Sequence, residues 1–356
     1  MDEQNAADQA ANEEAGVIAV SREESFQRAL NQACGDVPRM PRYDCLKDWQ
    51  IAYLRKIVVD REPLLFVTAP TGAGKSTVPF LTPHVYKSYE SPRVDSPAIV
   101  IIISPFVGLI QDQVDILRNK HSLFGYHYRK ELKSNDEMLD MVQNESLVYI
   151  FMCPETIMNN IDFFTEESSD MVKHVVAYFI DEAQEIVFKS DFRKQFLEIT
   201  KLGYRKPVVL MSGTALNEVR VGLSDAFNHV RNVEEATYGR PYITQNRPNL
   251  FYSFSTVKSL SKSDSFPYLN YLLHLMKDHK YNPAAFPKTV IYFQNVTSLS
   301  NLWKFFQANA PEVFRKRIFK YFSEYRDETK RVSQACASLF YSYPVYLYSC
   351  TAVVHT

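Results

Sequence analysis

The nine residues from Ala69 to Thr77 (APTGAGKST) constrain this chain more than any other feature of its sequence. An apolar run, residues 64–67 (LLFV), precedes them, so the order is a strand, a glycine-containing loop and the start of a helix. Glycines let backbone N–H groups close around phosphate oxygens, and the amino-terminus of the helix adds partial positive charge. The segment therefore predicts a phosphate-binding P-loop in which Ala69 replaces the usual first glycine.

Two side chains of this loop have chemical roles in phosphate binding. Lys75 is placed to reach the β- and γ-phosphates of a nucleotide, and the Ser76 hydroxyl is a ligand for Mg²⁺. An ordinary glycine turn before a helix is the alternative, and it does not need lysine and serine in this order. The predicted nucleotide-binding residues of the loop are Thr71, Gly72, Ala73, Gly74, Lys75, Ser76 and Thr77.

The composition is that of an ordinary globular chain, with 46% hydrophobic and 23% charged residues. Its length of 356 residues predicts two domains. The net charge of −1 excludes a global basic field, so any contact with nucleic acid must come from a local patch. The five cysteines include no C-x-x-C pair. No apolar run predicts a membrane span or a leader peptide, so we expect a nuclear or cytosolic protein without a membrane partner.

Short apolar runs alternate with helix-length segments between residues 41 and 245. This alternation predicts βαβ units and a parallel sheet. The expected strands are Leu64–Thr68, Ala98–Ile103, Leu147–Met152, Val175–Ile180 and residues 208–211. A further strand at Thr289–Phe293 and an amphipathic region at residues 299–306 predict the start of a second α/β unit.

A second motif, residues 176–184 (VAYFIDEAQ), lies about a hundred residues after the P-loop. A carboxylate at the carboxyl end of a strand beside a P-loop can hold the Mg²⁺ that bridges nucleotide phosphates, so Asp181 is the predicted metal ligand. Glu182 is the predicted general base for the attacking water. The alternative is a solvated acidic turn after a buried strand.

A third motif, Ser212-Gly213-Thr214, follows another apolar run at residues 209–211. Small hydroxyl residues at such a strand end can sense the state of a nucleotide and relay it to a bound strand of nucleic acid. Taken by itself, however, Ser-Gly-Thr is simply a turn. The interpretation therefore depends on the two motifs that precede it.

In this order the three motifs resemble the core of superfamily-two helicases, and other segments resemble the RecQ-like DNA helicases. Residues 103–114 (ISPFVGLIQDQV) are similar to motif Ia of that family, and residues 247–252 (RPNLFY) are similar to its signature at the lobe junction. Three shorter segments also resemble the family: residues 151–156 (FMCPET), 191–193 (DFR) and 290–293 (VIYF). The resemblance extends over residues 41–335.

The resemblance implies an α/β fold of RecA-like lobes. Residues 41–245 are expected to form a parallel-sheet P-loop NTPase lobe, and residues 246–356 a partial second RecA-like lobe. Residues 1–40 are expected to form an acidic, disordered tail, since the first 24 residues offer little to bury. The implied cofactors are ATP and Mg²⁺, and the implied partners are single-stranded and duplex DNA, unwound with 3′→5′ polarity.

The same resemblance assigns roles around the nucleotide. Residues 46–50 (LKDWQ) parallel the motif whose glutamine reads adenine, so Gln50 is the expected adenine contact. A glutamine on a helix surface is the alternative for Gln50. Lys75, Glu182 and Gln184 are the expected catalytic residues. Gln184 stands where the family usually has histidine, and its amide can still hydrogen-bond across the nucleotide cleft.

Seven residues are expected to contact nucleic acid or to couple that contact to hydrolysis. Hydroxyls and backbone amides at strand ends can hold phosphates without reading sequence. Phe188 stands where the family has an aromatic-rich loop, and it is expected either to stack on bases or to lie in the core. The set is Ser104, Pro105, Gly108, Thr156, Phe188, Ser212 and Thr214.

The carboxyl-terminal sequence departs from the family pattern. No lysine or arginine follows Arg331, whereas the family's motif VI supplies arginines that stabilise the charge of phosphoryl transfer. We therefore expect the second lobe to be incomplete. Three functions stay open: an ATP-dependent DNA helicase, a truncated nucleotide- or DNA-binding module without motor activity, and an RNA helicase.

Overall fold

The computed structural model describes part of the chain, in two compact units. Unit 1 is Met1–Pro248 and unit 2 is Asn249–Thr356. Both this division and the expected boundary at residue 245 lie outside the described residues, so that boundary stays a prediction. The described residues are 21–90, 97–128, 146–161, 164, 170–188, 199–202, 206–213, 217–231, 237–238, 270–287, 289–293, 296–321 and 345–349.

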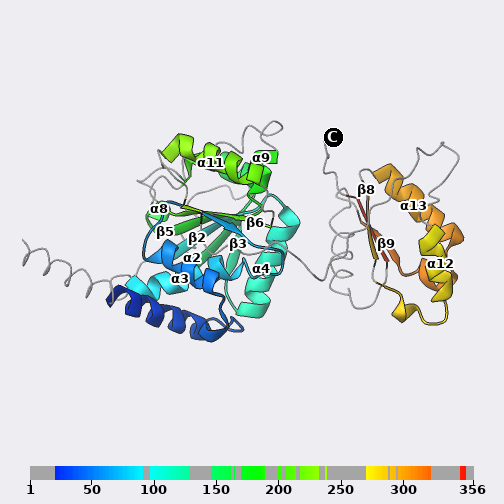
Figure 1. Cartoon of the computed structure of the whole chain (residues 1–356), viewed down its shortest axis with the longest axis horizontal. Helices are drawn as coiled ribbons and strands as arrows, with labels where there is room; N and C mark the ends of the chain where they lie inside the picture. Colours follow the sequence, from blue (N-terminus) through cyan, green and yellow to red (C-terminus); the bar gives the residue numbers. More distant parts are fainter. Residues whose placement is uncertain are drawn as a thin grey trace, which may run out of the picture. The chain divides into compact units, whose positions relative to one another are not determined.

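Among the described residues of unit 1, seven strands form one parallel sheet in the order β3-β4-β2-β5-β6-β1-β7 (Figure 1). All five strands expected here are present, and the predicted parallel sheet is confirmed. Four of them have the expected bounds, and β6 is one residue longer. The strands are β1 (Leu64–Thr68), β2 (Ala98–Ile103), β3 (Gly125–His127), β4 (Leu147–Met152), β5 (Val175–Ile180), β6 (Val208–Ser212) and β7 (Thr237–Tyr238).

Helices cover both faces of this sheet. The helices α2, α3 and α4 lie on one face, and α9 and α11 lie on the other (Figure 1). Successive strand residues point to opposite faces, so Ile102 packs in the first core and Ile103 in the second. The helical elements are η1 (Tyr43–Cys45), α2 (Asp48–Val58), α3 (Thr77–Glu90), α4 (Val107–His121), α6 (Pro154–Met158), α8 (Asp170–Lys173), α9 (Gln184–Phe188), η2 (Ile199–Lys201) and α11 (Asn217–Arg231).

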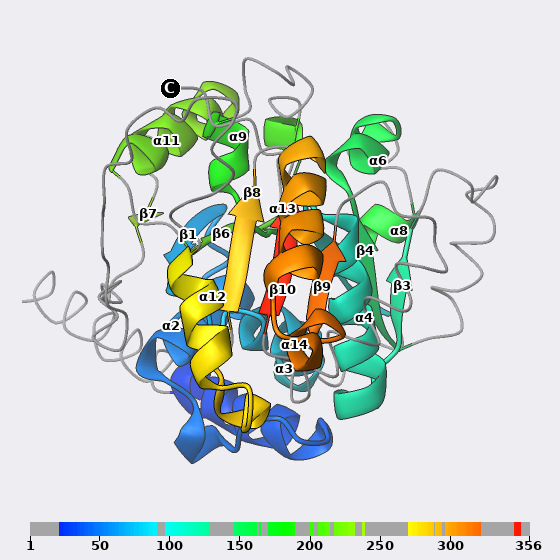
Figure 2. The ribbon, with the colours of Figure 1, turned by 90° about the vertical axis from the view of Figure 1, so that its right-hand side faces the viewer.

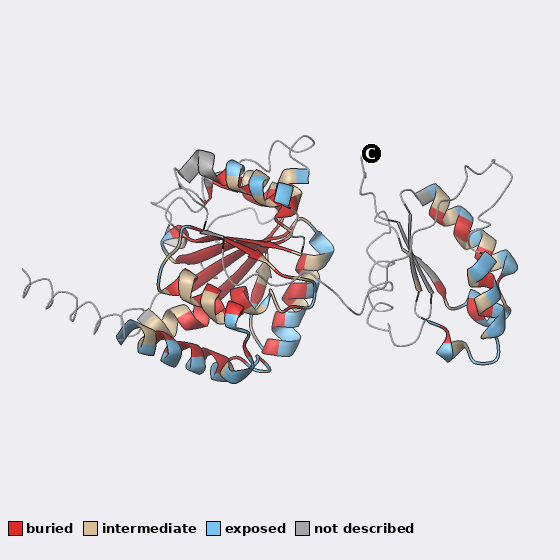
Figure 3. Cartoon of the chain, viewed as in Figure 1, coloured by how far each residue is buried: buried red, intermediate tan, exposed pale blue. Residues whose placement is uncertain are grey.

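Burial of both faces explains why these strands are continuous apolar runs. All six residues of β2 are buried, and so are all six of β5. Figure 3 shows the buried strands between helices whose outer faces are exposed. A parallel sheet with helices on both sides needs apolar residues at every strand position, not an alternating pattern.

The expectation of a disordered tail over residues 1–40 is wrong for its second half. Residues 21–36 are helical, and the side chains of Phe26 and Leu30 are fully buried in the same core as Trp49. The apolar residues recur at positions 26, 29, 30, 33, 34 and 37, which is helical spacing. This face was obscured in the sequence by the polar, alanine-rich stretch before it. Residues 1–20 lie outside the described part of the chain.

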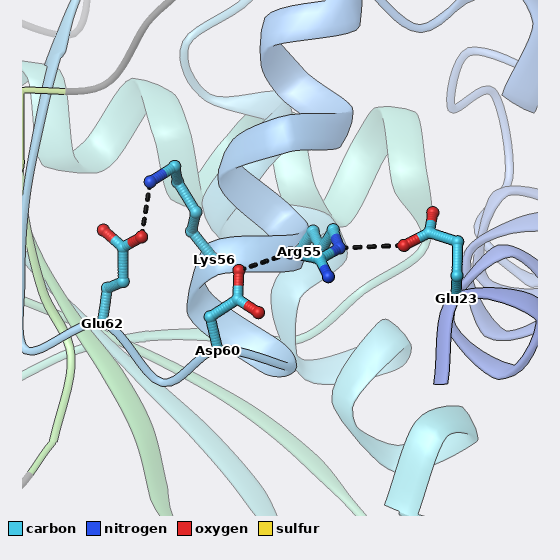
Figure 4. Close-up of polar contacts among 5 residues, drawn as sticks. All are labelled: Glu23, Arg55, Lys56, Asp60 and Glu62. Atoms are coloured by element: carbon cyan, nitrogen blue, oxygen red, sulfur yellow. Dashed lines mark hydrogen bonds and ion pairs between the residues drawn. The ribbon is translucent and has the colours of Figure 1, made fainter. Parts of the chain in front are cut away.

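Ion pairs add to the attachment of this helix (Figure 4). The Arg55 Nε lies 2.9 Å from the Glu23 Oε2, and its Nη1 lies 2.6 Å from the Asp60 Oδ2. Lys56 pairs with Glu62 beside them. Partly exposed pairs of this kind contribute at most about 1 kcal/mol each. The apolar contacts of the helix are therefore the main source of its stability.

We expect the buried His84 to make the stability of unit 1 depend on pH. Its side chain is buried on α3, and the Nε2 has no hydrogen-bond partner among the described residues. Burial lowers the pKa of His84 from its ordinary 6.5 to about 4, although Asp36 opposes the shift. Between these values the unfolded chain binds a proton that the folded chain does not, so stability falls as the pH falls. From pH 7 to pH 5 we expect a loss of about 2 kcal/mol from this residue.

Unfolding free energies at pH 7 and pH 5 test this expectation. The variant His84→Leu should lose less stability than the wild type over this interval, because the titrating group is gone. The same substitution at the exposed His274 is the matched control. Equal pH dependence in the wild type and His84→Leu would contradict the assignment.

Unit 2 contains a smaller parallel sheet, in the order β8-β10-β9 among its described strands (Figure 2). Phe306 and Phe314 are fully buried in its core. The strand β8 and the amphipathic part of α13 lie where the sequence predicts them, whereas β9 and β10 were not predicted. The elements are α12 (Asn270–Asp278), η4 (Pro283–Ala285), β8 (Thr289–Phe293), α13 (Val296–Asn309), α14 (Glu312–Arg315), β9 (Ile318–Tyr321) and β10 (Val345–Ser349).

Within the described ranges, none of the helices combines the length and the apolar character that a membrane span requires.

Candidate nucleotide and nucleic-acid site

The predicted P-loop connects β1 to α3. Its two glycines have left-handed backbone angles, with φ of +81° at Gly72 and +91° at Gly74. Residues with a Cβ rarely adopt these angles, so the loop requires glycine at both positions. An added Cβ at Gly74 would also lie 2.8 Å from the Gln50 Nε2. The loop is thus shaped both by its own glycines and by contact with α2.

Gln50 lies against the P-loop and not on the helix surface. Its side chain is only 3% exposed, and its Nε2 donates a hydrogen bond of 2.9 Å to the Gly74 carbonyl. Its Oε1 accepts one from the Lys47 backbone N–H, which caps α2. An amide has two N–H donors and two lone pairs on oxygen, so one donor and one acceptor site stay available for another contact.

Lys47 is a second contact of the loop that sequence reasoning missed. Its Nζ donates a hydrogen bond of 2.7 Å to the Ala73 carbonyl. Lys47, the N-cap residue of α2, and Gln50, in its first turn, hold two successive P-loop carbonyls. Their shared segment, residues 46–50, was recognised in the sequence, but only the glutamine was assigned a role.

The end of β6 lies directly beside the P-loop. Thr68 of β1 pairs with Ser212 of β6, and the Ala69 N–H donates a hydrogen bond of 3.1 Å to the Ser212 carbonyl. The Lys75 Nζ donates a hydrogen bond of 2.8 Å to the Ala69 carbonyl. A Cβ added to Gly213 would lie 3.8 Å from that Nζ. Parallel strands present their carboxyl ends at one edge, which explains how motifs far apart in sequence meet there.

The two acidic residues follow β5 at the same edge. Asp181 is buried, so the alternative of a solvated acidic turn does not describe it. Its Oδ1 accepts a hydrogen bond of 3.1 Å from the Glu182 backbone N–H, and its Oδ2 accepts one of 3.1 Å from the Gln113 Nε2. Gln113 lies on α4 and was not assigned a role from the sequence.

Burial determines the electrostatics of Asp181. Removal from water raises its pKa, and the neighbouring Glu182 carboxylate raises it further. The hydrogen bonds from Gln113 and the Glu182 backbone act in the opposite direction, as does the positive charge of Lys75. A buried carboxylate with a raised pKa is typical of a functional site, since a cation placed beside it would offset the cost of burial.

Glu182 and Gln184 connect this acidic pair to β6. The Ser212 Oγ donates a hydrogen bond of 2.6 Å to the Gln184 Oε1, and the Gln184 Nε2 donates one of 2.7 Å to the Glu182 Oε2. Glu182 itself has a left-handed φ of +50°, an uncommon backbone conformation that is frequent at functional sites. The glutamine that replaces the family's histidine therefore bridges two of the predicted motifs.

The residues predicted to contact nucleic acid differ in exposure. Phe188 is 56% exposed, so it does not lie in the core, while Gly108 is exposed and Pro105 is half-buried. Thr156 is buried, and Ser212 is fully buried in the bridge to Gln184. Thr214 lies outside the described residues.

The hydroxyl of Ser104 is also buried, and its proposed contact with nucleic acid stays a prediction. The side chain is fully buried, and its Oγ has no hydrogen-bond partner among the described residues. The Ser104 N–H bonds to the Met152 carbonyl and so extends the pairing of β2 with β4.

The fold and the carboxyl-terminal edge of its sheet define a P-loop NTPase lobe of the RecA-like class. At this edge the P-loop lies beside the end of β6, and hydrogen bonds connect the end of β6 to the acidic pair. Residues 48–220 match the family model of the DEAD/DEAH box helicases. Over these residues the chain is similar to the DEAD/DEAH box helicases.

Known proteins with similar sequences are also helicases. It is 28% identical over 203 residues to the ATP-dependent DNA helicase Q5 of Rattus norvegicus, a match covering 55% of this chain and 19% of that protein. It is 28% identical over 212 residues to the ATP-dependent DNA helicase Q-like 4B of Arabidopsis thaliana, covering 57% of this chain and 17% of that protein. The predicted resemblance to RecQ-like helicases is confirmed. The match spans less than a fifth of either relative.

The structure of the DEAD-box helicase Mss116 bound to ssRNA and UDP-BeF has a similar fold. The TM-score is 0.60 at 15% identity, over 85% of this chain and 60% of that chain. Identity this low shows the fold alone, and it confirms the predicted RecA-like α/β class.

Proposed function

We propose that the chain is the ATP-binding core of a RecQ-like DNA helicase, which couples ATP hydrolysis to duplex unwinding with 3′→5′ polarity. The observation that carries this proposal is the chain of hydrogen bonds from Ser212 through Gln184 to Glu182, beside the P-loop. The similarity of the chain to ATP-dependent DNA helicases supports DNA as the substrate. On the basis of the same similarity, we propose that the protein is located in the nucleus.

In this proposal the P-loop residues 71–77 bind the phosphates of ATP. Lys75 exchanges its bonds to the loop carbonyls for the β- and γ-phosphate oxygens. Gln50 contacts adenine with the donor and acceptor that it does not use on Lys47 and Gly74. Glu182 accepts the proton of the attacking water, and Gln184 orients its carboxylate.

The residues present fit Mg²⁺. The Asp181 carboxylate and the Ser76 hydroxyl are hard oxygen ligands, and Mg²⁺ usually binds one or two carboxylates together with substrate phosphates and water. When bound, the ion would neutralise charge on the phosphates.

We propose that nucleic acid contacts exposed residues near the same edge of the sheet. Gly108 lies in the first turn of α4, where unpaired N–H groups favour phosphates. Phe188, exposed at the end of α9, is suited to stacking on a base. Neither contact reads sequence, as expected for an enzyme that moves along any strand.

Nucleotide binding, ATPase activity and strand separation by this chain test the proposal together. We expect Mg²⁺-dependent binding of a fluorescent ATP analogue, and Lys75→Ala should weaken it by about 10- to 100-fold through loss of charged hydrogen bonds. Lys87→Ala, near the carboxyl end of the helix α3 that follows the loop, should bind as the wild type does.

The same measurements separate the alternative functions. Hydrolysis that DNA stimulates, with separation of a duplex carrying a 3′ single-stranded tail, supports the helicase proposal. Binding without turnover would indicate a nucleotide-binding module instead. Faster separation of a matched RNA duplex would indicate an RNA helicase, and absence of nucleotide binding would overturn both helicase functions and the nucleotide-binding module.

A further inference from the structure

Gln113 is an unusual residue for its position on α4. The buried face of this helix consists of Ile110, Gln113, Val114, Leu117 and His121, which recur at helical spacing. Gln113 is only 8% exposed within this face. A buried amide without a partner is costly, whereas an apolar side chain at the same position would be stabilising. The presence of glutamine therefore requires a specific partner.

That partner is the carboxylate of Asp181, 68 residues away in sequence. The Gln113 Nε2 lies 3.1 Å from the Asp181 Oδ2 in a buried hydrogen bond. The other oxygen, Oδ1, accepts the backbone N–H of Glu182. Each carboxylate oxygen thus has one donor, which restrains the rotation of the carboxylate and leaves further lone pairs on both oxygens.

This contact also extends the hydrogen-bond chain beyond the acidic pair. The chain runs from Ser212 through Gln184 to Glu182, and the Glu182 N–H continues it to Asp181. Gln113, on α4, is the last residue of this hydrogen-bond chain. The helix α4 begins at Val107, next to the proposed phosphate contacts at Pro105 and Gly108. One continuous set of bonds therefore joins the end of β6 to the helix that would contact nucleic acid.

We propose that Gln113 is a positioning residue of the nucleotide site, which holds the Asp181 carboxylate in the orientation that binds Mg²⁺ and ties it to α4. This inference rests on the proposed function, because it requires Asp181 to be a metal ligand. Gln113 touches neither the nucleotide nor the metal in this assignment. It acts through Asp181, as residues that hydrogen-bond to metal ligands generally do.

The magnesium dependence of nucleotide binding tests this assignment in the full chain. The variant Gln113→Met keeps the length and helix preference of the side chain but removes the donor. Loss of such a partner typically weakens metal binding by about 10- to 100-fold. We therefore expect the Mg²⁺ concentration that gives half-maximal binding of the fluorescent ATP analogue to rise by about that factor, with wild-type binding restored at saturating Mg²⁺.

Gln111 provides a matched control on the same helix. Its Nε2 bonds to the Asp115 Oδ1 four residues along, at 3.1 Å and away from the acidic pair. Gln111→Met should need the same Mg²⁺ concentration as the wild type. If Gln113→Met does not fold, Gln113→Asn replaces it, because its amide is one methylene too short to reach Asp181 and should give the same increase.

A purely structural role for Gln113 predicts a different result. In that case the folded variants would lose thermal stability but keep the wild-type magnesium requirement, and this outcome would overturn the inference alone. Nucleotide binding by the wild type that is independent of Mg²⁺ would overturn the metal site in the proposed function, and the inference with it. The two failures are therefore distinguishable by whether the wild type responds to Mg²⁺.

Discussion

The variant Glu182→Gln is expected to hydrolyse ATP about 10²- to 10⁴-fold more slowly than the wild type while binding nucleotide with similar affinity. The reason is that glutamine has nearly the same shape as glutamate but cannot accept the proton of the attacking water. Glu182 also has its Oε2 bonded to the Gln184 amide, which fixes the direction of the carboxylate. The P-loop contacts of Lys47 and Gln50 do not involve Glu182, so the binding surface stays intact.

Steady-state ATPase rates, with and without single-stranded DNA, measure this effect alongside binding of the fluorescent analogue. Glu185→Gln is the matched control, since it makes the same change of charge one helical turn away in α9. It should retain the wild-type rate. A Glu182→Gln rate within a few fold of the wild type would show that another group accepts the proton.

The variant Phe26→Ala is expected to destabilise unit 1 by about 3–5 kcal/mol, the usual cost of emptying a buried phenylalanine site. Phe26 is fully buried, and it packs in the core that also contains Trp49 and Leu54 of α2. This core supports the face of the sheet from which α2 reaches the P-loop. Loss of Phe26 should therefore weaken nucleotide binding at temperatures near the unfolding midpoint.

Denaturant unfolding followed by Trp49 fluorescence measures this change. The chain has two tryptophans, so a Trp303→Phe background leaves only the probe in unit 1. Arg28→Ala, at an exposed position of the same helix, is the control and should change the unfolding free energy by no more than about 0.5 kcal/mol. Similar values for both variants would mean that residues 21–36 do not contribute to the core as the structure indicates.

Much of the fold of unit 1 was predictable because its strands are buried on both faces. Such strands are short apolar runs with few polar interruptions, and β1, β2, β4 and β5 were each located to the residue. The strands of unit 1 that were not predicted are shorter and lie at the edges of the sheet. β3 and β7 are short strands at the two edges of the sheet, with three and two residues, and so carry little sequence signal.

The helix at residues 21–36 was not predicted from the sequence for a different reason. Its apolar residues are spaced for one buried face, but alanine, glutamate and glutamine dominate the sequence around them. Only the surface against which a helix packs decides whether such a pattern is buried or solvated. Here that surface is the core that also contains residues of α2, and the pair of Arg55 with Glu23 adds a contact to that helix.

By itself, the sequence determined the chemistry of the site and its place in the fold. Ala69–Thr77 and Asp181 follow apolar strands, Ser212 ends another, and parallel strands bring their carboxyl ends to one edge. The tertiary structure alone decided which side chains touch. The P-loop carbonyls are held by Lys47 and Gln50, and Asp181 by Gln113. A hydrogen bond depends on atomic positions within a few tenths of an ångström, and spacing along the chain does not specify these across 68 residues.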